Sequence, residues 1–197
     1  LGRLNEAIPW LKKAMEARRY ATPHFPHLNL ADVWIEKEQW RKALDACERA
    51  LLLVPDQPLP PFPTRVIGVA GPTETRIDPA RVTEVPAIEA AITAYLDAWS
   101  RRDPEAVIGM SALDSRATVK TVMLHLVEAK VRGLPTRVED LEVVHLSGDE
   151  AIVSILPMQG VEPVTSAYLL LLVDESWKVG AAVIDLSPES GPQSPLS

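Results

Sequence analysis

The chain has 197 residues, of which 47% are hydrophobic and 24% charged, and its formal net charge is −7. This apolar content excludes a disordered chain and suffices for one large or two small domains. Residues 1–55 hold nine Lys/Arg and seven Asp/Glu, whereas residues 56–197 hold eleven and twenty. The acidic second part argues against nucleic acid and anionic membrane surfaces as partners, because both attract clustered cations. No apolar run approaches the ~20 residues of a membrane span.

The cysteine and histidine content argues against a metal site. Cys47 is the single cysteine of the sequence, which excludes an internal disulfide and a cysteine-based zinc cluster. The four histidines have no metal-ligand spacing and no glycine-rich phosphate loop is present, so we expect no metal and no cofactor. The sequence begins inside a helical pattern, which predicts a truncated N-terminus with any targeting segment upstream of Leu1. The compartment stays open, with the cytoplasm favoured over the periplasm.

The first 55 residues have the spacing of packed helices. Residues 2–18 are predicted to form one helix, and residues 28–37 and 40–54 to form a helical hairpin that ends at Pro55. The small and large apolar residues of the first helix recur in the third, and Ala7 and Ala43 are 36 residues apart. Repetition at such an interval indicates stacked structural repeats.

The residues that carry a family resemblance are Leu30, Ala31, Trp34, Trp40, Ala43, Cys47, Ala50 and Pro55. With them, residues 1–55 resemble one and a half tetratricopeptide (TPR) repeats, whose repeat length is about 34 residues. The resemblance implies a surface that holds another protein and has no chemistry of its own. It also gives Cys47 a buried position in a helix.

By the same resemblance, the groove that binds a partner would be formed by Phe25, Leu28, Asn29, Asp32 and Ile35. Asn29 suits a clamp for a peptide carboxylate, but Leu28 replaces the basic residue of that clamp and Asp32 would repel a carboxylate. We therefore expect no such clamp. The apolar residues suit an apolar helix or extended segment of a partner, or packing against a preceding repeat.

Residues 56–83 are predicted to be a linker. Five prolines lie between Pro55 and Pro63, a density that excludes a helix or a central strand. Such a stretch is a semi-rigid spacer or a ligand for an SH3-like groove. Residues 65–70 could form a short strand, and residues 72–86 are predicted to be irregular.

Three helices and then strands are predicted in the second part. The first helix starts near Pro86 and carries an apolar stripe through Trp99, the second is capped by Asp103, and the third is capped by Ser115 and stops at Gly133. Alternating residues then predict two hairpins. The strands are 137–146 with 151–156 and 166–173 with 177–184, before a disordered tail at 187–197.

A second resemblance covers residues 84–186. It rests on the residues from Ala87 to Trp99, on 102–106, on 138–146, on 148–153 and on 172–179. These residues resemble the NTF2-like (SnoaL-like, cystatin-roll) family, which implies an α+β cone of three helices on a curved antiparallel sheet. The family often dimerises through the sheet. Both faces of strand 166–173 are apolar, which predicts either a surface for a second copy or for the TPR segment, or a central strand buried on both sides.

In that family the cone can hold a small molecule, and Tyr95, His125, His145 and Tyr168 are the candidates to line it. His145 is expected on the strand face of Leu141 and Val143. No residue matches a catalytic constellation, so none is assigned a catalytic role. The function expected is a non-enzymatic scaffold or an accessory subunit of a larger assembly. The alternative is a small-molecule-binding protein or a SnoaL-like enzyme.

Overall fold

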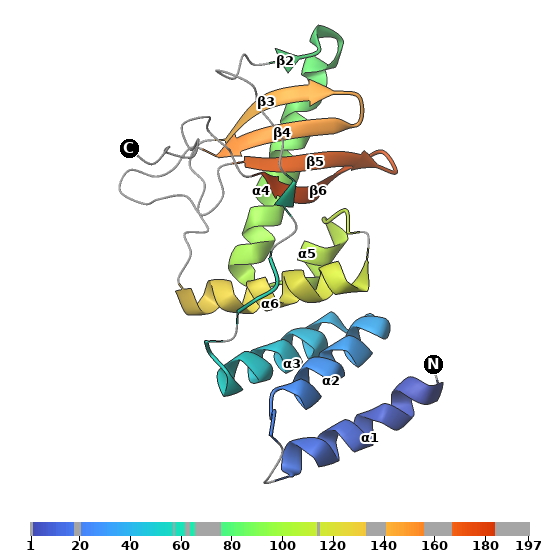
Figure 1. Ribbon diagram of the computed structural model, residues 1–197. Coiled ribbons are helices and arrows are strands. Elements are labelled where there is room, and N and C mark those ends of the chain that lie inside the picture. Colours follow the sequence, from blue (N-terminus) through green and yellow to red (C-terminus); the bar gives the residue numbers. More distant parts are fainter. Residues whose placement is uncertain are drawn as a thin grey trace, which may run out of the picture. The chain divides into compact units, whose positions relative to one another are not determined.

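A computed structural model describes residues 2–17, 21–56, 58–61, 64–65, 76–113, 115–132, 141–155 and 167–183. The described residues form helices and a sheet whose four longer strands are antiparallel, which confirms the predicted α+β class (Figure 1). Contacts divide it into two compact units. Unit 1 contains residues 1–63 and 94–137, and unit 2 contains residues 64–93 and 138–197.

Unit 1 is helical. Its elements are α1 (Gly2–Glu16), α2 (Phe25–Glu36), α3 (Trp40–Leu53), the second half of α4 (Val85–Arg101), α5 (Pro104–Gly109) and α6 (Arg116–Arg132). α2 begins three residues earlier than predicted, because Pro26 lies in its first turn, where a missing N–H costs no helical hydrogen bond. The predicted caps are confirmed, since Asp103 accepts from the N–H of Ala106 and Ser115 from that of Thr118.

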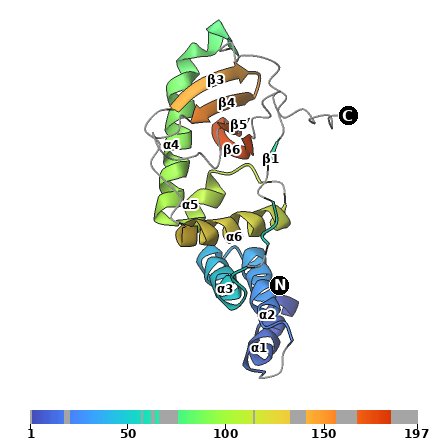
Figure 2. The ribbon, with the colours of Figure 1, turned by 60° about the vertical axis from the view of Figure 1, so that its left-hand side comes forward.

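The core of unit 1 explains why the α2–α3 hairpin and α6 belong together. Both helices of the hairpin pack on α6, and α3 also packs on α5 (Figures 1 and 2). The buried residues of this core are Ala31, Ile35, Ala43, Leu44, Ala46, Cys47, Val119, Met123, Leu124, Leu126 and Val127. Packing therefore groups residues 1–63 with 94–137, whereas composition divides the chain at 55 and 83.

Unit 2 is built on a six-stranded sheet of order β1-β6-β5-β4-β3-β2. The strands are β1 (Thr64–Arg65), β2 (Arg76–Ile77), β3 (Leu141–Ser147), β4 (Glu150–Ile155), β5 (Ala167–Val173) and β6 (Ser176–Val183). β3 to β6 are antiparallel, and β1 and β2 add parallel pairs at the two edges. The first half of α4 lies along one face of this sheet (Figures 1 and 2).

The segment predicted to be irregular, residues 72–86, contains regular structure where it is described. β2 pairs with β3, and a 3-10 helix, η1 (Pro79–Glu84), follows it. The side chain of Asp78 caps η1 by accepting from the N–H of Ala80 at 2.9 Å, and Pro79 fits its first turn. Of the predicted strand 65–70, only Arg65 is described, within β1.

Both predicted hairpins are confirmed. Gly148 has φ +55° in the turn between β3 and β4. Asp174 and Glu175 have φ of 48° and 60° between β5 and β6, as a two-residue turn with positive φ at both positions requires. Gly133, residues 137–140, 156, 166 and 184, and the predicted disordered tail lie outside the described residues.

Two irregularities bend the sheet and decide which side chains share a face. In β3 the register shifts between Val143 and His145, and in β5 it shifts between Leu169 and Leu170, opposite Gly180 of β6. The first shift corrects a prediction, because it puts His145 on the opposite face from Val143. Leu169 and Leu170 are both buried, which fits the predicted alternative of a central strand covered on both faces.

Candidate functional site

The residues predicted to form a partner-binding groove on α2 are largely used inside unit 1. Ile35 is 4% exposed in the core, and Leu28 packs against that core. The carboxylate of Asp32 forms an ion pair with Lys120 of α6, with Oδ2 2.8 Å from Nζ. One helical turn further along α2, Glu36 pairs with Arg116 of α6. In the second half of the predicted groove, Ile35 is therefore buried in the core shared with α6, and Asp32 is ion-paired with α6 while its side chain stays 50% exposed.

These two ion pairs fix the direction of α6. Along α2 the acidic residues run from Asp32 to Glu36, while their partners on α6 run backwards from Lys120 to Arg116. α6 is thus antiparallel to α2.

One broad side of α6 is buried in the core of unit 1, while Arg116 and Ala117 at its start are exposed. Its most buried residues are Val122, Met123, Leu124, Leu126 and Val127, none more than 5% exposed. These positions span more than half of the helix circumference, a wider apolar face than the single stripe of a surface helix. Replacing α6 with a partner helix would expose all of them, so the face it covers is closed to partners.

The turn between α4 and α5 is strained at Arg102 and forms ion pairs with α3. Arg102 has φ 54°, a left-handed conformation that residues other than glycine rarely adopt. In this conformation its Nη2 lies 3.4 Å from Oε2 of Glu48. The neighbouring Asp103 lies 3.6 Å from Nη2 of Arg41, and Glu105 lies 3.4 Å from Nε of Arg41. Charges on α3 therefore favour this turn.

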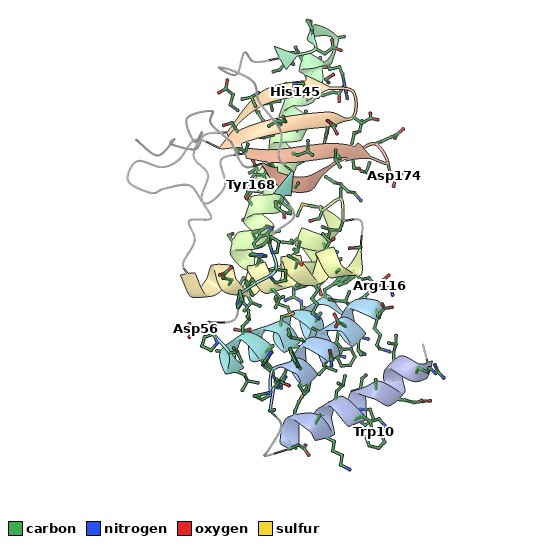
Figure 3. All side chains as sticks on the ribbon, viewed as in Figure 1. Trp10, Asp56, Arg116, His145, Tyr168 and Asp174 are labelled. Carbon is green, nitrogen blue, oxygen red and sulfur yellow. The ribbon has the colours of Figure 1, made fainter. Side chains whose placement is uncertain are left out.

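The other predicted groove residues and one residue missed by sequence reasoning remain accessible. Asn29 is exposed, and Phe25 is 46% exposed with its ring 4.4 Å from that of His24. The missed residue is Trp10 of α1, which is 71% exposed and points away from α2 (Figure 3). The repeat spacing could not have found it, because Trp10 stands 36 residues before Ala46, a core residue, and that match predicts a buried side chain.

Two of the pocket candidates lie in unit 1. Tyr95 is 2% exposed, and its ring lies edge-on to that of Trp99 with centroids 6.1 Å apart. His125 donates from Nε2 to the carbonyl oxygen of Pro60 at 2.9 Å, and its Nδ1 lies 3.3 Å from Oε2 of Glu128. Tyr95 is thus a core residue, and His125 connects α6 to the proline-rich segment.

The other two candidates, His145 and Tyr168, lie in unit 2 (Figure 3). His145 pairs with Ile152, and Tyr168 pairs with Val153. Because paired residues share a face and Ile152 and Val153 are consecutive, the two side chains point to opposite faces. They therefore cannot line one pocket.

The pKa shifts of Cys47 and Glu84 have structural causes. Burial raises the pKa of the Cys47 thiol to about 12, so this side chain is a small apolar core residue and not a nucleophile. In unit 2, Arg81 donates to both carboxylate oxygens of Glu84 at 2.6 and 2.7 Å and lies over the ring of Trp177. The hydrogen bond from Arg81 lowers the pKa of Glu84. These contacts hold η1 to β6.

Within the described part of the chain, no group of three or more His, Cys, Asp or Glu side chains could hold a metal ion. None of the described helices has the length and apolar character needed to cross a membrane. Comparison of the chain with protein-family models, with curated proteins and with solved structures finds no significant match.

Proposed function

We propose that this chain is a non-enzymatic interaction protein, a scaffold or accessory subunit that binds another protein through α1 and the start of α2. In this proposal α1, α2 and α3 are one and a half TPR repeats. The elements from α4 to β6 are an NTF2-like module that contributes α6 to the core of the repeats. The proposal differs from the groove expected from sequence, because Ile35 is buried in the core shared with α6 and Asp32 is ion-paired with Lys120 of α6.

The observation that carries the proposal is the exposure of Trp10. A tryptophan side chain buries 150–250 Å² when covered, and tryptophan is enriched among the residues that dominate binding energy. Trp10 is 71% exposed, with the Nζ of Lys13 5.7 Å from its ring. The adjacent helix adds Phe25, which is 46% exposed. Two accessible aromatic side chains on neighbouring helices suit an apolar segment of a partner.

The test is native mass spectrometry of the complex isolated mildly from its own source. Extra protein subunits with the unmodified chain, and their loss from the Trp10→Glu and Phe25→Glu variants, would support the proposal. The matched control is Leu52→Glu, because Leu52 is equally accessible at 73% exposure but lies at the end of α3. Retention of the partner by both aromatic variants would contradict binding through α1 and α2. An even number of copies would instead support self-association through the sheet.

The alternative function, a small-molecule-binding protein or SnoaL-like enzyme, has less support. It requires polar groups that converge on one cavity. Tyr168 and His145 point to opposite faces of the sheet, and the Nε2 of His125 is engaged with Pro60. A bare monomer that retains a small molecule in the same mass spectrum would favour this alternative over the scaffold.

A further inference from the structure

The four residues from Pro58 to Pro61 form an irregular segment on the surface of unit 1. They have neither helical nor strand structure, and Pro58, Pro60 and Pro61 are exposed. Proline fixes φ near −65°, which biases a segment with this composition toward the polyproline II helix. That helix has three residues per turn, so in this conformation Pro58 and Pro61 would lie on the same edge, about 9 Å apart at 3.1 Å per residue.

The same segment is held in place from its other side. Leu59 is partly buried and packs against the core of the hairpin and α6. The carbonyl oxygen of Pro60 accepts the hydrogen bond from His125 on α6. A segment fixed at two points loses little conformational freedom when it binds, which lowers the entropic cost of recognition.

We propose that Pro58–Pro61 is a recognition segment for a protein domain that binds polyproline II helices in an aromatic-lined groove. Adjacent slots between aromatic side chains would take the rings of Pro58 and Pro61, as in the known mode of proline-rich recognition. Asp56, exposed two residues before Pro58, favours a groove with a basic residue at that end. The proposed segment uses residues other than the exposed aromatic residues of α1 and α2.

The experiment uses the full chain and two isolated probe domains, one SH3-like and one WW-type, each labelled with nitrogen-15. Unlabelled chain is added up to about 1 mM, and the amide and indole resonances of each domain are followed. We expect saturable shifts confined to the aromatic groove of at least one domain. The Pro58→Ala/Pro61→Ala double variant should weaken this binding at least tenfold.

Two further variants separate recognition from general effects. Pro79→Ala replaces an exposed proline of η1 and should bind like the unmodified chain. His125→Leu removes the bond to Pro60 and should bind more weakly while Pro58 and Pro61 are retained. The proposal is overturned if neither domain shifts at about 1 mM chain, or if the double variant produces the same shifts. A negative result in this experiment leaves the proposed function of α1 and α2 unaffected, because that proposal is tested with variants of Trp10 and Phe25.

Discussion

α1 and α3 have the same spacing of apolar residues but very different surroundings. Ala43 and Ala46 of α3 are buried, at 0% and 4% exposure, because α3 packs on α2, α5 and α6. The matching positions of α1 are Ala7, which is half-buried, and Trp10, which is 71% exposed. Equal spacing therefore predicts equal helices, whereas the elements that cover each helix decide which positions form a core and which remain free to bind.

The largest effect is expected where the two helices differ most, at the contact of α3 with α6. Met123 of α6 is fully buried in the core that contains Cys47 of α3. Met123→Ala should lower the free energy of unfolding by about 2–5 kcal/mol through lost contacts and a cavity. It should also speed alkylation of Cys47, which is protected in the folded protein by its burial and by the raised pKa of its thiol.

Urea denaturation and the rate of iodoacetamide labelling measure these two changes. The control is Leu52→Ala, since Leu52 is 73% exposed and should change neither quantity by a significant amount. If Met123→Ala lowered stability while Cys47 stayed as protected as before, the hairpin would be stable without α6. The contrast between α3 and α1 would then come from α2 alone.

Exchanging the side chains at the matched positions gives the second effect. Ala46→Trp places a large ring in a closed core and should destabilise the protein by about 3 kcal/mol or more. The reverse change, Trp10→Ala, removes an exposed ring and should alter the free energy of unfolding by no more than about 0.5 kcal/mol. Thermal denaturation of both variants measures the difference. Similar losses in the two variants would mean that Trp10 stabilises the fold and is not free for a partner.

Local structure was the part that the sequence predicted best. The start of α3 at Trp40, the caps at Asp103 and Ser115, and the turn at Gly148 follow from short-range rules about proline, hydroxyl, carboxylate and glycine residues. Burial of Cys47 followed from the repeat spacing. Each of these features depends on neighbours within a few residues, which a sequence shows directly.

Long-range features could not be predicted in the same way. The pairing of Asp32 with Lys120 joins residues 88 apart, and nothing in either segment indicates the other. The bulge in β3 changes the face of His145 without a glycine or proline to mark it. The predicted pocket included His145 on the strength of a predicted sheet face. One extra residue in β3 reverses that face.

The third effect concerns the ion pair between Asp32 and Lys120. The side chains are 50% and 24% exposed, so a double-mutant cycle with Asp32→Ala and Lys120→Ala should give a coupling of about 0.2–1 kcal/mol that falls with added salt. The comparison pair is Asp97 with Arg101, which lies on one helix and is more exposed. We expect a smaller coupling there. Equal couplings would show that the contact between α2 and α6 gives the Asp32–Lys120 pair no advantage over an exposed pair within one helix.

The smallest effect is a pH dependence at the start of α2. Burial and the nearby charge of Arg49 on α3 lower the pKa of His27 from its ordinary 6.5. The folded state therefore favours the neutral ring, and His27 contributes stability that is complete above pH 6.5 and is lost as the pH falls from there toward the pKa of the folded protein. His27→Gln should reduce the loss of stability between about pH 7.5 and about pH 5, measured by urea denaturation of both proteins. The causes of this pKa shift include the charge of Arg49 on α3 and no charge on α1. A smaller pH dependence of stability in His27→Gln would therefore place the effect at the α2–α3 contact. An unchanged slope would mean that protonating His27 does not weaken that contact.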